Sequence, residues 1–116
     1  SLGHIMGVFK QYEEDVLDIL LSGTLSCEQI SAVKAEGKLS RDQHTGHGYL
    51  VSVTHPCLPL NRIICHTPMV VGSAEGIECN FSVFIDNGSL TIECDAVAID
   101  VIPLDFRNFD VHISVA

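Results

Sequence analysis

Two runs of alternating apolar and polar residues, joined by Asn87-Gly88, constrain the fold of this chain more than any other stretch. They occupy residues 76–98, with the sequence GIECNFSVFIDNGSLTIECDAVA. Asn-Gly is the preferred centre of a type I′ turn, because both of its residues tolerate a positive φ. Residues 76–98 are therefore predicted to form a β-hairpin with a two-residue loop.

A two-residue loop also determines which residues of the hairpin lie opposite each other. Asp86 faces Ser89, and the predicted ladder continues with the pairs Ile85 and Leu90, Val83 and Ile92, Phe81 and Cys94, and Cys79 and Ala96. One face is then almost wholly apolar, whereas the opposite face carries Glu78, Asn80, Ser82, Phe84, Thr91, Glu93 and Asp95. A slip by one residue would expose the whole apolar set to water, so the register is strongly specified.

An amphipathic helix is predicted over residues 8–21. Its apolar side chains take about a third of the helical wheel, and polar side chains take the other side. The acids Glu13, Glu14 and Asp15 lie in its N-terminal half, where the helix dipole favours negative charge. We expect these acids to form part of the solvated face.

A second, short helix is predicted from Cys27 to about Glu36. Ser26 can cap its first turn, and Gln29 can complete a capping box as the third helical residue. Gly37 follows as the residue that ends the helix.

Three further segments predict strands. Residues 49–54 are rich in β-branched side chains, and residues 62–71 indicate one strand, interrupted or at an edge, around Pro68. Residues 109–115 alternate again, and we expect them to close the sheet. Residues 38–48 are polar and contain glycine, which fits a loop or an edge strand, and we interpret them as a connector.

This order of elements predicts an α+β fold, with two N-terminal helices packed on one face of a mainly antiparallel sheet of about five strands. Residues 6–116 are expected to form a single domain. Residues 1–5 resemble an expression-tag remnant, and Met6 is the expected native start, so residues 1–5 contribute to neither the predicted fold nor the predicted function.

The charge balance restricts the partners of this chain. Fifteen Asp and Glu against six Lys and Arg give a formal charge of −9, which repels phosphate backbones and anionic lipid headgroups. Nucleic-acid and membrane binding are therefore not expected, whereas the same charge would attract a basic protein partner. Because the chain has no long apolar run and no signal-peptide pattern, we expect it to be cytoplasmic.

The five cysteines, which are Cys27, Cys57, Cys65, Cys79 and Cys94, are odd in number and lie mostly within apolar runs. This distribution favours reduced core thiols over a disulfide framework. In the predicted hairpin Cys79 and Cys94 are diagonal neighbours, so a bond between them would require distortion.

The best candidate for a metal or ligand site is a cluster of His55, Cys57, Cys65 and His66. Thiolate and imidazole are ligands that zinc accepts, but the spacing differs from that of common zinc sites, and adjacent strand residues point to opposite faces. Cys57 with a nearby histidine is an alternative, as a nucleophile and base. No cofactor or metal is predicted.

The polar face of the hairpin is the other candidate. Glu78, Glu93 and Asp95 could act as paired carboxylates, although a half-buried sheet produces such a solvated row without any function. Phe84 and Val97 interrupt this row with apolar surface, which fits a contact surface. Elsewhere the chain carries none of the standard hydrolase, nucleotide-binding or metalloprotease motifs.

Several strings resemble one group of proteins. They are GYLVSVTHPCLPLNRI at residues 48–63, GIEC at residues 76–79, FSVFIDNGSLTIEC at residues 81–94, DFR at residues 105–107, and the closing DVHI. Together they resemble small uncharacterised bacterial proteins of the kind carried on mobile gene cassettes. The resemblance implies a bacterial accessory protein, implies no activity, and assigns no functional residue.

The residues support two hypotheses. The first is a small, non-enzymatic, intracellular protein-interaction domain of an immunity or regulatory type, with an acidic surface. It would form a homodimer through a sheet edge or the polar hairpin face, with the candidate interface residues Phe84, Val97, Val111 and His112. The second is a small-molecule-binding or catalytic domain that uses the cluster of His55, Cys57, Cys65 and His66.

Overall fold

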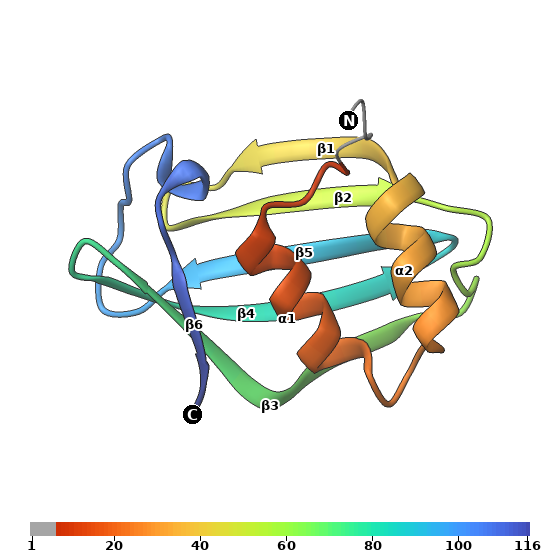
Figure 1. Ribbon diagram of the computed structural model, residues 1–116. Helices are drawn as coiled ribbons and strands as arrows, with labels where there is room; N and C mark the ends of the chain where they lie inside the picture. Colours follow the sequence, from red (N-terminus) through yellow and green to blue (C-terminus); the bar gives the residue numbers. More distant parts are fainter. Residues whose placement is uncertain (1–6) are drawn as a thin grey trace, which may run out of the picture.

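The computed structural model describes residues 7–116, which form two helices packed on a six-stranded antiparallel sheet (Figure 1). The helices are α1 (Gln11–Leu21) and α2 (Cys27–Glu36), and a short 3-10 helix, η1, spans Phe106–Asn108. The strands are β1 (Lys38–His44), β2 (Gly48–Thr54), β3 (Ile63–Ala74), β4 (Ile77–Asp86), β5 (Ser89–Ala96) and β6 (His112–Val115). Their order across the sheet is β1-β2-β5-β4-β3-β6. The predicted α+β class is confirmed, with six strands instead of about five.

The additional strand is β1, a segment whose sequence predicted a connector. It pairs antiparallel with β2 and forms one edge of the sheet. Its side chains are almost all exposed, so the segment lacks the apolar alternation by which strands are recognised. Backbone pairing with β2, and not burial of side chains, holds it in the sheet.

The predicted hairpin is formed by β4 and β5, and its register is confirmed at every predicted pair, from Asp86 and Ser89 to Cys79 and Ala96. Asn87 has a φ of 50° and Gly88 a φ of 78°, as the type I′ turn requires. The hairpin supplies the two central strands, on which the rest of the sheet is built.

Strand β3 is interrupted, as predicted. Residues 70–73 lie between β4 and β6, whereas residues 63–65 pair only with β4 within the part of the chain that the structure describes. Cys65 pairs with Val83 and Val70 pairs with Phe81, so residues 66–69 bulge out opposite a single residue of β4. Beyond the bulge, β3 pairs with β4 on one side and β6 on the other.

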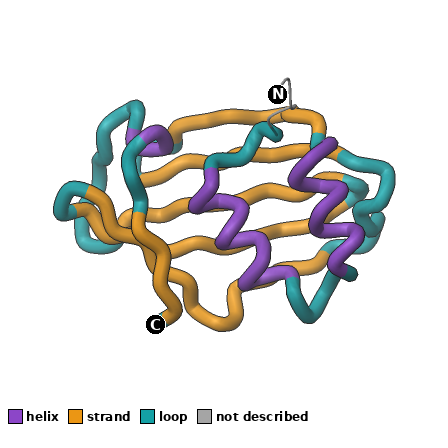
Figure 2. The backbone as a smooth tube through the Cα atoms, in the orientation of Figure 1, coloured by secondary structure: helices purple, strands orange, loops and turns teal. Residues whose placement is uncertain are grey.

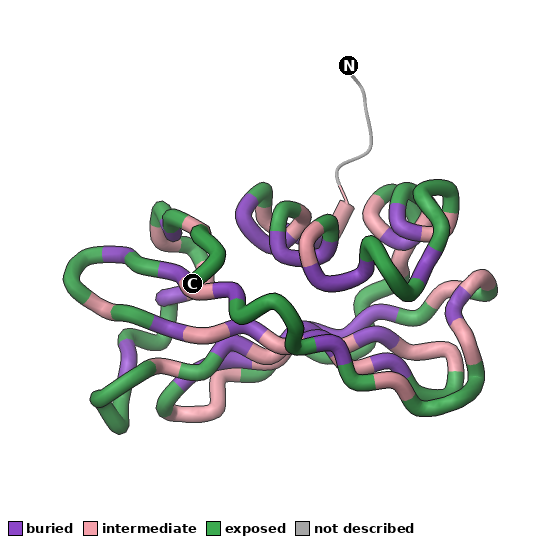
Figure 3. Tube along the Cα trace, turned by 90° about the horizontal axis from the view of Figure 1, so that it is seen from below, coloured by how far each residue is buried: buried purple, intermediate pink, exposed green. Residues whose placement is uncertain are grey.

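Both helices lie on the same face of the sheet (Figures 1 and 2). Viewed along the sheet, the buried residues lie between the helices and the strands (Figure 3). The core includes Val16, Leu17, Leu21 and Val33 from the helices and Val51, Val53, Phe81, Val83, Ile85, Leu90 and Ile92 from the sheet. Of residues 7–116, no helix covers the other face, which we call the open face.

Helix α2 begins as predicted. The Ser26 hydroxyl accepts the Gln29 N–H at 3.1 Å, and the Gln29 side chain accepts the Ser26 N–H at 2.9 Å. This reciprocal capping satisfies two N–H groups that the first turn leaves unpaired.

Helix α1 is shorter than predicted, because Lys10 is extended and residues 7–9 are not helical. Glu14 is half-buried and Asp15 is exposed, but the expectation that Glu13 lies on the solvated face was wrong. Its side chain is completely buried. Glu13 follows Phe9 by four residues and precedes Val16 by three, so it lies on the apolar stripe of the helix.

The C-terminal segment crosses close to the sheet at Gly72. A Cβ atom at this position would lie 2.7 Å from the Phe81 ring and 2.9 Å from the Val111 side chain. The absence of a side chain therefore allows Val111 to pack against the sheet. The predicted tag remnant, residues 1–5, and the predicted start at Met6 lie outside the described residues.

Candidate functional site

The four residues of the predicted His/Cys cluster are distributed over two segments. His55 and Cys57 lie in the loop after β2, whereas Cys65 and His66 belong to β3. Cys65 is buried beneath the helices, and His66 is exposed beside it. Among residues 7–116, no three His, Cys, Asp or Glu side chains are grouped closely enough to hold a metal ion.

His55 and Cys57 do lie together, but their bonds do not make a nucleophile and base. His55 Nδ1 accepts the Cys57 N–H at 3.0 Å, so the proton of the neutral ring is on Nε2, which lies 2.9 Å from a Glu36 carboxylate oxygen. Both ring nitrogens are therefore engaged away from the thiol. The Cys57 thiol donates to the Gln29 carbonyl, and burial raises the pKa of Cys57, which disfavours the reactive thiolate.

The other cysteines are consistent with the predicted core thiols. All five are free, and Cys65, Cys79 and Cys94 are buried. The Cys79 and Cys94 side chains share a hydrogen bond, which together with burial raises the pKa of Cys94. The Cys79 thiol lies in the core next to Gly72, 3.0 Å from where a Cβ atom of residue 72 would be.

A densely hydrogen-bonded polar group surrounds Glu13, and we call it the Glu13 cluster. It consists of Glu13, Arg107, Tyr12, Tyr49 and Asp42. Arg107 donates from Nε and Nη2 to the two Glu13 carboxylate oxygens, each at 2.8 Å, which is the strong bidentate arrangement. The Tyr49 hydroxyl donates to Glu13 at 2.6 Å and lies 2.8 Å from the Tyr12 hydroxyl.

The outer contacts of the Glu13 cluster join three parts of the chain. Tyr12 donates to the Arg107 carbonyl at 2.8 Å, and Arg107 donates to the Val8 carbonyl at 2.7 Å and to Asp42 of β1 at 3.4 Å. The start of α1, the edge strand β1 and the 3-10 helix η1 are thus held at one point. The sequence did not predict this cluster, although a carboxylate on the apolar stripe of a helix was its signal.

Burial affects every titratable side chain of this cluster for which a shift is resolved. It raises the pKa of Tyr12 and of Tyr49 well above the usual tyrosine value, and the nearby Glu13 charge acts in the same direction. Burial lowers the pKa of Arg107, but its hydrogen bonds to Glu13 and the Glu13 charge outweigh this effect and raise it overall. The tyrosines therefore stay neutral and the arginine stays charged at physiological pH.

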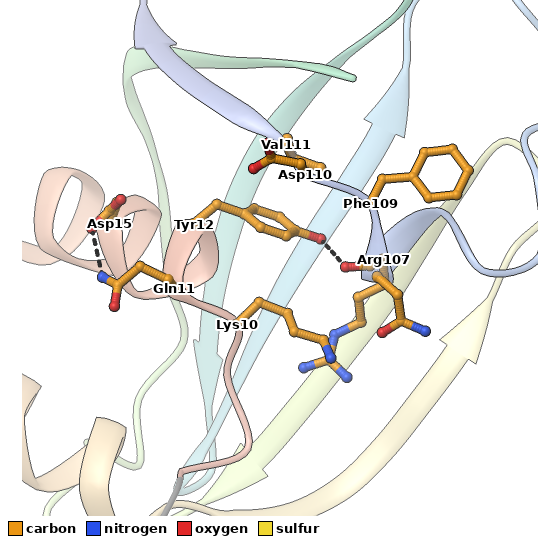
Figure 4. Close-up of a pocket in the computed structure, with 9 residues that line it drawn as sticks. Lys10, Gln11, Tyr12, Asp15, Arg107, Phe109, Asp110 and Val111 are labelled. Atoms are coloured by element: carbon orange, nitrogen blue, oxygen red, sulfur yellow. Dashed lines mark hydrogen bonds between the residues drawn. The ribbon is translucent and has the colours of Figure 1, made fainter. Parts of the chain in front are cut away.

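A pocket of about 440 Å³ lies beside this cluster, between the start of α1 and the segment after η1 (Figure 4). Its charged side chains are Lys10, Arg107, Asp15 and Asp110. They are of both signs and therefore select no ligand charge. The Arg107 guanidinium and the Gln11 and Asp15 side chains are already bonded within the protein, which leaves few polar groups for a ligand.

The open face has a different composition. Its strands carry the acids Glu78, Asp86, Glu93 and Asp95, and it also carries exposed or half-buried apolar side chains, which are Leu50, Ile64, Met69, Val71, Phe84 and Val97. Phe84 lies directly opposite Ile64, which is 49% exposed. Lys38 and Arg41 of the outer strand β1 pair with Thr54 and Ser52, so they lie on this same face, at its β1 edge.

At one end of the open face the apolar side chains form a groove of about 400 Å³, which we call the β3–β5 groove. It is lined by Met69, Val71, Glu78, Asn80, Val97 and Ala116. Met69 and Val97 are 56% and 42% exposed. The bulge of β3 and the end of β5 thus produce a concave apolar surface bordered by a carboxylate.

The predicted interface residues fall into two groups. Phe84 and Val97 lie on the open face, where the sequence predicted a contact surface, and His112 is exposed on the edge strand β6. Val111 is buried, because it packs over Gly72, and its side chain is not available to a partner in this structure.

Over residues 7–116, neither helix combines the length and apolar composition needed to cross a membrane. Comparisons of the chain with protein-family models, with curated proteins and with solved structures found no match.

Proposed function

We propose that this chain is a non-enzymatic protein-interaction domain that binds a basic partner protein through the open face of its sheet. The observation that carries the proposal is the combination of four carboxylates and exposed apolar side chains on one uncovered sheet face. Apolar surface supplies affinity in protein interfaces, and surrounding charge selects the partner and speeds its approach.

The opposite side of the molecule does not offer this combination. The outward surfaces of α1 and α2 carry acids such as Asp15, Asp18 and Glu28, but their large apolar side chains point into the core. A formal charge of −9 attracts a basic partner to any side of the protein, so the apolar side chains decide which face is contacted.

A self-complementary contact between two open faces is less favourable where it brings Glu78, Glu93 and Asp95 of both copies together. Like charges placed opposite each other across an interface weaken binding by roughly several kcal/mol. A basic partner converts the same groups into attractive contacts.

In the cell, we propose a bacterial accessory role of an immunity or regulatory type, in the cytoplasm. An immunity-type protein needs only a surface that binds and blocks its target. This role requires no catalytic centre, which agrees with the engaged nitrogens of His55 and the raised pKa of Cys57.

The test is selection of peptides from a random display library on the immobilised full chain, followed by titration of one synthetic winner into isotope-labelled protein. We expect the selected peptides to carry net positive charge. Because salt screens surface charges, their affinity should fall at least about tenfold between roughly 50 mM and 500 mM salt. Amide shifts should concentrate on β3, β4 and β5.

Binding by peptides without net positive charge would contradict the proposal, as would shifts confined to α1 and α2. A variant with Glu93→Lys should bind the peptide more weakly, whereas Asp18→Lys on the outer surface of α1 makes the same charge change and should have less effect. If both variants lost the same affinity for the peptide, the loss would come from the net charge of the protein alone, and the open face would be rejected as the binding site.

A further inference from the structure

We propose that the β3–β5 groove is the anchor site of this interface, and that it takes one apolar side chain of the partner that is flanked by a lysine or arginine. This inference rests on the proposed function and narrows it to one end of the open face. Interfaces concentrate their binding energy in a few side chains that enter well-packed pockets, so an anchor site must be concave, apolar and accessible.

The groove meets these three requirements. Val71 and Met69 of β3 form one wall, and Val97, which follows β5, forms the other. Val97 is attached to the neighbouring strand by the bond from its N–H to the Glu78 carbonyl at 2.8 Å, and Ala116 donates its N–H to the Met69 carbonyl at 3.0 Å. The walls are therefore held in place by backbone hydrogen bonds.

The charge at the border of the groove defines the chemistry of the occupant. Glu78 is exposed, and Asp95 lies on the adjacent strand, paired with Asn80 in the ladder. Asp95 is bonded to His47, whereas Glu78 projects beside the groove with its carboxylate accessible. A cationic side chain next to the apolar anchor of the partner can reach Glu78.

Two other apolar surfaces fit an anchor less well. Phe84 and Ile64 lie side by side across the β3–β4 pair, and they line neither of the two pockets described above. Val101 and Leu104 are 75% and 85% exposed on the loop after β5, but a projecting loop would have to enter a pocket on the partner. In the groove, apolar walls and an accessible carboxylate meet.

The experiment measures the affinity of one selected synthetic peptide for single variants of the full chain. Val97→Glu and Met69→Glu add a charge within the groove at exposed positions, and each should weaken binding about tenfold or more. Leu104→Glu makes the same change at a more exposed apolar residue outside the groove and should leave the affinity within about twofold. Circular dichroism verifies that each variant is folded.

Two further measurements test the chemistry of the occupant. In an alanine scan of the peptide, one apolar residue and an adjacent lysine or arginine should each be essential. Glu78→Gln should weaken binding and reduce its salt dependence, whereas Glu28→Gln, on the first turn of α2, should change neither.

If Phe84→Glu abolished binding while Val97→Glu and Met69→Glu kept full affinity, the groove would not be the anchor site, although the open face would remain the binding surface. Amide shifts confined to α1 and α2 on addition of the peptide would overturn both proposals. A third outcome is that no peptide is selected and the protein forms a dimer that Val97→Glu converts to a monomer. The groove would then bind a second copy of the chain, and the proposal would also be overturned.

Discussion

Glu13 shows how strongly a single residue depends on the rest of the chain. Its carboxylate is completely buried, and its main partner, Arg107, is 94 residues away in the sequence. A buried carboxylate without a partner lowers the stability of a fold by roughly several kcal/mol. Glu13 and Arg107 must therefore be considered as one group. That group also joins α1 to the C-terminal segment.

Arg107→Met should lower the free energy of unfolding by about 3–5 kcal/mol, because it leaves the Glu13 charge buried without its partner. The double variant Glu13→Leu with Arg107→Met should recover much of this loss, since it removes both charges. Urea denaturation of the three proteins measures these differences.

The matched control is Lys34→Met, which breaks the pair between Lys34 and the exposed Asp18, 2.6 Å apart. Exposed pairs contribute about 0–1 kcal/mol, so this variant should unfold almost as the parent does. If Arg107→Met were as mild as Lys34→Met, the burial of the Glu13 cluster would be incorrect.

The tyrosines of the Glu13 cluster give a prediction for alkaline pH. An unfolded tyrosine titrates near pH 10, whereas the pKa values of Tyr12 and Tyr49 are raised in the folded protein. Above about pH 10, the folded state therefore binds more protons than the unfolded state does. The contribution of these two tyrosines to the free energy of unfolding is constant below about pH 10 and falls above it. The slope is at most about 1.4 kcal/mol per pH unit for each tyrosine.

Tyr49→Phe removes one of these two titrations. Above about pH 10 its stability should decline less steeply than that of the parent, although the variant starts lower because Glu13 loses a hydrogen bond. Denaturant unfolding at several pH values measures both slopes. Parallel curves would show that Tyr49 is not protected from ionisation in the folded state.

At the scale of single elements, the hairpin of β4 and β5 depends on its turn. Gly88→Val should lower the free energy of unfolding by about 1–3 kcal/mol, because a β-branched residue is strained at a positive φ. The strain is conformational and not a collision, since the nearest atom to a Cβ at this position, in Leu60, is 4.0 Å away. Thermal or urea unfolding measures the loss.

Gly23→Val provides the comparison for this variant. Gly23 lies in the turn after α1, outside the left-handed region, and a Cβ there would meet no atom within 4 Å. Its substitution should have little effect on stability. Similar melting temperatures for Gly88→Val and the parent would mean that the loop is not a type I′ turn in solution.

At the scale of the whole molecule, the two edges of the sheet differ in their protection against pairing with another chain. Strand β1 has a bulge between Leu39 and Arg41 and carries Lys38 and Arg41, features that discourage edge pairing. Strand β6 has exposed His112 and Ser114 instead. The predicted homodimer is therefore expected to form through β6, by antiparallel pairing with its symmetry mate.

The bond from the Ala116 N–H to the Met69 carbonyl indicates which groups of β6 are free. Because hydrogen bonding alternates along an antiparallel pair, the N–H groups of Ile113 and Val115 point to the outer edge. Ile113→Pro should therefore abolish the dimer and keep the fold, whereas Ser114→Pro should disturb the pairing with β3. Light scattering of the parent giving only the 12.6 kDa monomer at high concentration would contradict the dimer.

Local chemistry allowed several elements to be predicted from the sequence. Asn87-Gly88 specifies its turn and, through the period of two, the register of β4 and β5, and Ser26 with Gln29 specifies the start of α2. In each case the interacting groups are within a few residues of one another, so their contacts depend little on the remaining fold.

Tertiary structure alone decided the features that join distant segments. The polar strand β1 exists because β2 offers it a backbone partner, and Glu13 is buried because Arg107 reaches it from the other end of the chain. The β3–β5 groove likewise requires the bulge of β3 to place Met69 on the wall opposite Val97. The physical reason is common to all three: the favourable interaction joins segments that are far apart in the sequence, so it exists only after the whole sheet has assembled.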